Sequence, residues 1–203
     1  ATAHCTEVRV ALEPALKAQY ALAPARGKFR LASENPQKAG VARRILAHHA
    51  GEPTLVIGAY LQQLRLFARS LGAPLITGQT PQAERERLYA AFRRGEIRLL
   101  VVSKVANFAI DLPDASVAIQ ISGTFGSRQE EAQRLGRILR PKSDGGPAHF
   151  YSIVTRATRD QEFAVNRQLF LTEQGYSYRI LDAGELDREL GQPAAVRQTA
   201  RPT

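Results

Sequence analysis

The sequence contains one cysteine, no methionine and no tryptophan among its 203 residues. Because one thiol cannot form an internal disulfide, Cys5 is typical of a protein kept in a reducing compartment, and we expect a cytoplasmic location. The lack of an initiator methionine is compatible with a fragment or a processed product. No apolar run has membrane-spanning length, and the opening ATAHCTEVRV lacks the basic and then apolar layout of a secretory signal, so we expect no membrane association.

Two motifs that bind nucleoside triphosphates are also missing. The sequence has no G-x-x-x-x-G-K-[ST] loop to cradle phosphates and no D-E-x-[DH] pair to hold magnesium. We therefore expect that this chain does not hydrolyse ATP by itself. No metal site is expected either, because His4 with Cys5, His48 with His49, and His149 are too scattered to suggest a set of zinc ligands.

Positive charge is in excess, since 28 Lys and Arg residues against 19 Asp and Glu residues give a formal net charge of +9. This excess suggests a polyanionic partner such as DNA, although solubility or tail composition would produce it too. Several aromatic residues could stack on bases, but their spacing fits a core or packing role better. They are Tyr151, Phe163, Phe170, Tyr176 and Tyr178.

Short apolar runs alternate with amphipathic stretches, as in the crossover units of a parallel sheet. We expect strands at residues 6–11, 54–57, 75–77, 99–103, 117–122, 149–154 and 176–181. We expect helices at residues 13–20, 36–50, 60–71, 81–94, 129–141 and 159–174. Asn35 and Thr80 are expected to cap helices, and Gly72 and Gly175 to end them. The sequence thus predicts an α/β fold, a three-layer open parallel sheet with helices on both faces.

The most informative run is QEEAQRLGRILRP at residues 129–141. On a helix, Gln133, Arg137 and Arg140 share one stripe, and the aliphatic side chains share the opposite one. Two guanidinium groups at this spacing can reach the outer phosphates of one nucleotide, and Gly136 would let a ligand approach closely. An isolated R-x-x-R is more often a solvated surface pair, but the full Q-R-x-G-R-x-x-R pattern favours phosphate contact.

A polar loop follows the predicted strand at residues 99–103, at the edge where open parallel sheets bind ligands. Ser103, Lys104 and Asn107 can contact the phosphates of a nucleic-acid strand, and Asp111 can accept a hydrogen bond from a nucleotide ribose. The alternative is a simple turn in which Asp111 holds its own backbone.

A second loop, at residues 123–128, leads into the predicted arginine helix. Its two glycines allow close approach of a ligand, and Arg128 lies where the helix amino terminus favours anions. Tight turning alone would also explain the glycines. Both loops are expected to border one crevice.

Together these segments resemble the second RecA-like lobe of a superfamily 2 helicase, and within it the XPB-type DNA repair helicases. LVIGAYLQQL is similar to that family's fourth motif, VVSKVANFAIDLPDASVAIQIS to its fifth and QEEAQRLGRILRP to its sixth. The ending RQLFLTEQGYSYRIL is more distinctive of the XPB group, and CTEVRV with FRLASENPQK resembles the stretch joining the two lobes. The resemblance extends from Cys5 to about Leu181. It departs from the superfamily in lacking a glycine before Asp111.

The resemblance implies a role for each candidate residue. Arg137 and Arg140 would be arginine fingers acting on ATP and Mg bound mainly by the other lobe, with Gln133 helping to position them. Gly136 and Asp111 would lie near the nucleotide. The residues that would contact the DNA backbone are Ser103, Lys104, Asn107 and Arg128.

The implied protein is the C-terminal motor lobe of an ATP-dependent, 3'-5' DNA helicase or translocase in repair. Its expected partners are DNA, an N-terminal helicase lobe, and an accessory nuclease or repair factor. We divide the chain into a thumb-like lead-in at residues 1–34, the RecA-like lobe at 35–183 and a flexible tail at 184–203. A non-catalytic DNA-binding or protein-interaction module with a helicase-like fold is the alternative.

Overall fold

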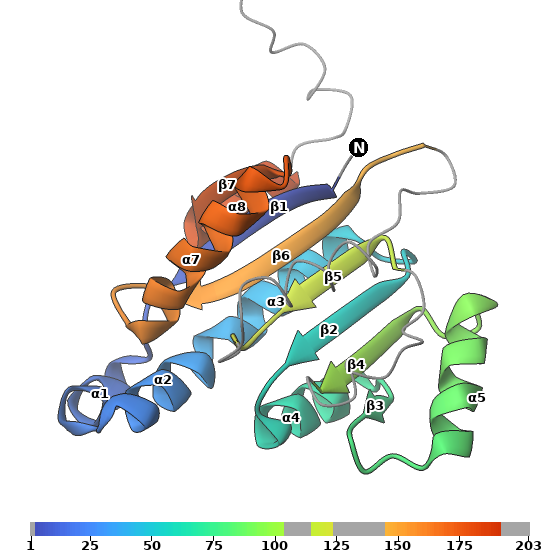
Figure 1. Cartoon of the computed structure of the whole chain (residues 1–203), viewed down its shortest axis with the longest axis horizontal. Helices are drawn as coiled ribbons and strands as arrows, with labels where there is room; N and C mark the ends of the chain where they lie inside the picture. The colour runs from blue at the N-terminus through green and yellow to red at the C-terminus, as the bar shows by residue number, and fades with distance from the viewer. Residues whose placement is uncertain (1–2, 104–114, 124–144, 192–203) are drawn as a thin grey trace, which may run out of the picture.

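The computed structural model describes residues 3–103, 115–123 and 145–191. Within these residues, seven strands form one sheet in the order β3-β4-β2-β5-β6-β1-β7, and all neighbouring strands are parallel (Figure 1). The strands are β1 (Ala3–Val10), β2 (Thr54–Gly58), β3 (Leu75–Ile76), β4 (Leu99–Ser103), β5 (Val117–Gln120), β6 (Ala148–Thr155) and β7 (Ser177–Asp182). The predicted open parallel sheet is confirmed.

Helices cover both faces of this sheet. They are η1 (Pro14–Leu16), α1 (Lys17–Leu22), α2 (Ala25–Ser33), α3 (Gln37–His48), α4 (Leu61–Leu71), α5 (Gln82–Arg93), α7 (Arg159–Glu173) and α8 (Ala183–Gly191). One core lies between the sheet and helices α5 and α7, and the other lies between the sheet and helices α3, α4 and α8. The three-layer arrangement is therefore also confirmed.

The alternation of side chains along each strand fills both cores. In β4, Leu100 and Val102 contribute to the core beneath α5 and α7, while Val101 contributes to the opposite one. Strands that are buried on both faces are continuously apolar, which explains why the runs TLVI and LLVV were readable from the sequence.

The predicted helix ends agree with the structure at three positions. Gly72 ends α4 with φ 61°, and Gly175 follows α7 with φ 84°, both in the left-handed region that favours glycine. Oδ1 of Asn35 accepts a hydrogen bond from the backbone N–H of Gln37 at 3.2 Å, at the start of α3.

The expected cap at Thr80 is wrong. Helix α5 begins at Gln82, directly after Pro81, and no side chain caps it. Oγ1 of Thr80 instead accepts a hydrogen bond from the backbone N–H of Thr77 at 2.9 Å. The hydroxyl is used by the preceding turn, and a local cap pattern does not distinguish the two uses.

Both ends of the described chain differ from the predicted division. Strand β1 lies between β6 and β7, so residues 3–10 are an inner part of the sheet and not a separate lead-in. The tail expected from residue 184 does not begin there, because residues 183–191 form α8 and Leu186 is fully buried. A role of the intervening segment as a thumb-like element stays a prediction.

Within the described ranges, no helix is both long and apolar enough to span a bilayer.

Candidate functional site at the carboxyl edge of the sheet

The carboxyl ends of the parallel strands meet at one edge of the sheet, and the arrowheads in Figure 1 point toward it. Gly58, the last residue of β2, is the register partner of Ser103, the last residue of β4. The two chain segments that resemble the fourth and fifth helicase motifs therefore leave the sheet side by side. Ligands of open α/β sheets bind at this edge.

Of the predicted site residues, Ser103 is the one that lies in the described part of the chain. It ends β4, as expected, and is 2 % exposed. A DNA contact by its hydroxyl would require the covering chain to move, and the assignment stays a prediction. The other eight lie outside the described residues: Lys104, Asn107, Asp111, Arg128, Gln133, Gly136, Arg137 and Arg140.

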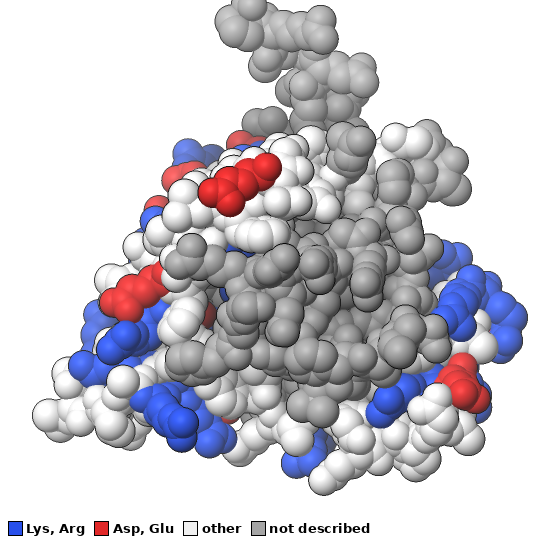
Figure 2. Space-filling view, in the orientation of Figure 1, with Lys and Arg blue, Asp and Glu red and all other residues white. Residues whose placement is uncertain are grey.

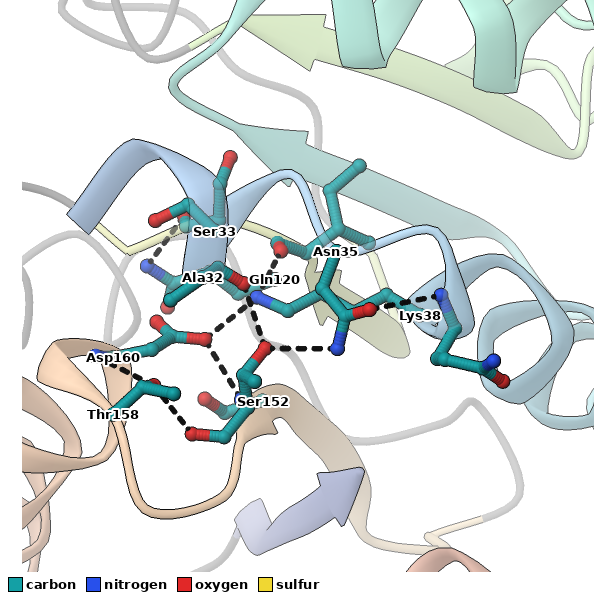
Figure 3. A network of polar contacts seen from close by, with 12 residues as sticks. Ala32, Ser33, Asn35, Lys38, Gln120, Ser152, Thr158 and Asp160 are labelled. Carbon is teal, nitrogen blue, oxygen red and sulfur yellow. Dashed lines mark hydrogen bonds and ion pairs between the residues drawn. The ribbon is translucent and has the colours of Figure 1, made fainter. Parts of the chain in front are cut away.

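A buried ion pair lies beneath this edge (Figure 3). Nζ of Lys38, in α3, is 2.7 Å from Oδ2 of Asp160, in the first turn of α7, and it also donates to the backbone carbonyl of Ile121 at 2.8 Å. Asp160 Oδ2 accepts a further hydrogen bond from the backbone N–H of Thr155 at 2.9 Å. Burial lowers the pKa of Lys38, and the charge of Asp160 opposes that shift.

A second buried cation, Arg167 of α7, lies close to this pair. Its Nη1 donates to Oγ of Ser152 at 2.8 Å, and its charge further lowers the pKa of Lys38. A Cβ atom built on Gly123 would lie 3.5 Å from Nη2 of Arg167 and 3.6 Å from Oδ1 of Asp160. Two buried cations and one carboxylate therefore lie directly beneath the residue at which the loop 123–128 begins.

Further polar contacts fix the strand ends relative to α2 and α3. Nδ2 of Asn35 donates to the carbonyl of Ala11 at 2.8 Å and to Oγ1 of Thr155 at 3.2 Å. Oγ1 of Thr155 in turn donates to the carbonyl of Ala32 at 2.6 Å. These bonds join the ends of β1 and β6 to the turn between α2 and α3, so the edge is held rigidly from below.

Gly58 shows why the end of β2 needs glycine. A Cβ atom there would lie 2.8 Å from Cδ2 of Leu64 and 2.8 Å from Oγ of Ser122. That hydroxyl accepts a hydrogen bond from the backbone N–H of Ala59 at 2.6 Å, which links the ends of β2 and β5. Any larger residue would push these two strand ends apart.

Sequence reasoning missed Lys38, Asp160 and Arg167. A usable signal exists for Lys38, because it shares the apolar stripe of α3 with Val41 and Ile45, at i, i+3 and i+7. A lysine on such a stripe needs a buried anionic partner. Asp160 gives no comparable signal, since an acid in the first turn of a helix is ordinary.

The four histidines, scattered in the sequence, gather at the opposite edge of the sheet. Ring centroids are 5.8 Å apart for His4 and His149, 5.0 Å for His49 and His149, and 4.8 Å for His48 and His49. Nε2 of His49 lies 2.7 Å from the hydroxyl of Tyr151. No group of three or more potential ligands in the described parts could hold a metal ion.

Comparison with known proteins gives a consistent result. The family model described as the ERCC3/RAD25/XPB C-terminal helicase matches residues 1–198. The chain is 59% identical over 187 residues to the protein named DNA 3'-5' helicase XPB of Kineococcus radiotolerans, covering 92% of this chain and 34% of that protein. It is 36% identical over 187 residues to the general transcription and DNA repair factor IIH helicase/translocase subunit XPB/SSL2 of Saccharomyces cerevisiae, covering 89% and 22%. The chain thus spans about a third of the length of its bacterial relative.

Among solved structures, the C-terminal domain of the DEAD-box protein Dbp5 superposes with a TM-score of 0.68 at 14% sequence identity. The match covers 94% of this chain and 96% of that domain. At this identity the likeness establishes the fold, which is that of a RecA-like helicase lobe.

Proposed function

Because the chain belongs to the family of ERCC3/RAD25/XPB C-terminal helicase domains, we propose that it is the second motor lobe of an ATP-dependent 3'-5' DNA helicase or translocase acting in repair or transcription. The observation that carries the proposal is the family match over residues 1–198, which includes the complete Q-R-x-G-R-x-x-R run. The parallel sheet supports it by bringing the candidate motifs to one edge.

In this proposal Arg137 and Arg140 are arginine fingers, and Gln133 positions them. Their guanidinium groups would stabilise the charge that develops on the γ-phosphate of ATP, whose phosphates and Mg²⁺ are held by the other lobe. Gly136 would allow the nucleotide to approach, and Asp111 would bind its ribose. The chain alone lacks the phosphate loop and the acidic pair, so it would not turn ATP over.

The same edge would contact DNA mainly through phosphates, without sequence preference. The proposed residues are Ser103, Lys104, Asn107 and Arg128. The net charge of +9 and the two buried cations beneath Gly123 support an anionic ligand here. We also propose an N-terminal helicase lobe and a repair factor or nuclease as protein partners, since the yeast relative is named as a subunit of a repair factor.

The test uses the two-lobed parent protein. Arg137→Ala should lower ATP turnover by a factor of about 10³ or more, because arginine fingers contribute about 10³ to 10⁵ in rate. DNA affinity should stay nearly unchanged, and Arg188→Ala in α8 is a control that removes an exposed arginine elsewhere. Wild-type turnover in Arg137→Ala would refute the assignment.

A second measurement uses the lobes separately. The isolated chain should show no ATP turnover, and mixing it with the first lobe should restore DNA-stimulated hydrolysis. A chain that binds DNA but never restores turnover would instead be a non-catalytic module.

A further inference from the structure

A pocket with a volume of about 590 Å³ opens between α2, α7 and the segment that precedes α4. Its lining combines three aromatic and three basic side chains, and we call it the basic–aromatic pocket. These residues are Arg26, Phe29, Arg30, Tyr60, Arg159 and Phe163. All six lie in the described part of the chain, and none is among the site residues that the sequence predicted.

The aromatic rings form one side of the pocket. Phe29 is 1% exposed and forms the base, with the ring of Phe163 edge-on to it at 4.9 Å and that of Tyr60 at 6.4 Å. Phe163 and Tyr60 are only partly buried, so each leaves ring surface open to the pocket. The sequence favoured a packing role for Phe163, and this arrangement gives it a partly open ring instead.

The basic side chains form the rim. The guanidinium of Arg30 lies 5.5 Å from the centroid of the Tyr60 ring, and Arg30 is 58% exposed beside Glu34. Arg159 is 45% exposed, and its ion pair with Glu162 is long, at 3.5 Å. Arg26 is exposed and makes no hydrogen bond or ion pair with the described residues. Three cations thus face two carboxylates, which leaves the rim positive.

Charge around the pocket has the same sign. Figure 2 shows Lys and Arg side chains gathered over α2 and over the start of α7. An adjoining hollow is lined by Lys17, Tyr20 and Arg156, and the hydroxyl of Tyr20 accepts a hydrogen bond from the backbone N–H of Arg159. The positive surface therefore continues beyond the pocket along a path that a phosphate chain can follow.

Open aromatic faces beside unengaged guanidinium groups are the combination that binds nucleotides of a single strand. Bases stack on the rings without regard to sequence, and phosphates pair with arginine. The volume falls in the range of about 300–1,000 Å³ that small-molecule sites occupy. A purely apolar partner would leave the arginines without counter-charges, so an aromatic anion fits better.

We propose that the basic–aromatic pocket binds one nucleotide of single-stranded DNA, with its base stacked on Phe163 and Tyr60 and its phosphate held by Arg26 and Arg159. The identity of the strand rests on the proposed DNA motor function. The stacking site rests on its own geometry. A nucleotide held here would lie beside the carboxyl edge, next to Gly123, whose Cβ position is 3.6 Å from Cζ of Phe29.

The experiment uses the 203-residue chain and a single-stranded oligonucleotide with one 2-aminopurine, whose fluorescence is quenched by stacking. Phe163→Leu keeps an apolar side chain but removes the ring, and it should weaken binding about 5- to 100-fold, as for loss of one stacked base. It should also relieve the quenching. Leu169→Ala, an exposed apolar residue of the same helix, is the matched control and should change neither signal.

The basic residues are tested by salt dependence. Arg26→Ala combined with Arg159→Ala should reduce the slope of log affinity against log salt, because fewer phosphates are neutralised. Arg188→Ala should leave the slope unchanged. Circular dichroism and thermal midpoints show whether each variant is folded, and Phe163→Tyr, which retains a ring, should restore quenching if the site is a stacking platform.

Three results would overturn the proposal. One is unchanged affinity and quenching in folded Phe163→Leu. Another is free dAMP competing as well as the strand, which would make the ligand a mononucleotide. The third is an acidic aromatic peptide displacing DNA with higher affinity, which would make the pocket a protein-docking site. None of these depends on ATP, so they are distinguishable from a failure of the Arg137→Ala test.

Discussion

Nζ of Lys38 and Oδ2 of Asp160 are 2.7 Å apart, and neither side chain is more than 4% exposed. The pair joins α3, which covers one face of the sheet, to α7, which covers the other. Because Lys38 also donates to the carbonyl of Ile121, the pair connects the two helical layers through the end of β5. The edge proposed to bind nucleotide and DNA is therefore anchored by a buried charge pair.

We expect this pair to show strong coupling. Lys38→Met leaves a buried carboxylate without its counter-ion, and breaking such a pair from one side costs about 3–5 kcal/mol. Asp160→Leu leaves a buried ammonium group and should be similarly destabilising. The double variant should lose much less than the sum of the two.

Urea unfolding of the four proteins measures the coupling. Arg94→Ala, which opens an exposed pair with Glu96, is the control and should scarcely move the midpoint. Additive effects of Lys38→Met and Asp160→Leu would mean that the two charges do not depend on each other.

The thiol of Cys5 is expected to be inert in the folded protein. It is 2% exposed in the inner strand β1, and burial raises its pKa from 9.0 to about 12. Since the thiolate is the reactive form, iodoacetamide at pH 8 should label the native chain at the rate of its unfolding. Mass spectrometry across a urea series checks this, and labelling that is fast below the unfolding transition would contradict the burial.

Local sequence patterns determined most of the fold. Continuous apolar runs located the inner strands, and the glycines at 72 and 175 located helix ends, because these signals depend on neighbouring residues only. The place of β1 between β6 and β7 has no local signal, since strand order is set by packing of distant segments. The same holds for Asp160, which meets Lys38 across 122 positions.

Two segments were misread because composition outweighed pattern. The basic stretch at residues 26–30 lies in α2, whose buried side holds Phe29 and Ala32 while its arginines point outward. The polar run after residue 183 forms α8 because Leu186 packs into the core. In both, a few apolar residues at helical spacing decide the structure. The arginine fingers were proposed from spacing alone and stay a prediction.

Stability should fall at alkaline pH through Tyr178. Its hydroxyl donates to Oε1 of Glu7 at 2.6 Å, and burial, with Glu7 next, raises its pKa above the ordinary 10.0. Above about pH 10 the unfolded chain loses this proton while the folded chain keeps it, so stability decreases as pH rises. Cys5 acts in the same direction between about pH 9 and 12.

Tyr178→Phe should lower stability at pH 7 by about 1.5–3 kcal/mol, since a hydrogen bond to a charged group is lost. Its further loss between pH 9 and 11 should be shallower than in the wild type. Urea midpoints across this range test both effects, and Cys5→Ala removes the thiol contribution so that the two are separated. An unchanged alkaline slope in Tyr178→Phe would show that the tyrosine does not carry it.

Two glycine substitutions should have opposite effects. At Gly58 a methyl group would come within 2.8 Å of both Leu64 Cδ2 and Ser122 Oγ, in a site where both neighbours are buried. Gly58→Ala must therefore displace the hydroxyl that accepts from Ala59, and overpacking of this kind costs about 1–3 kcal/mol. The two strand ends at the proposed ligand edge would separate.

Gly40 is the matched control, because it lies inside α3, is exposed, and has nothing within 4 Å of its Cβ position. Gly40→Ala should stabilise the chain by about 0.5–1 kcal/mol, since alanine restricts the unfolded backbone and favours helix. Thermal unfolding of the two variants compares them directly. Equal midpoints would mean that the contact between the ends of β2 and β5 is loose, and that the fourth-motif segment is not held against Ser122 as the structure shows.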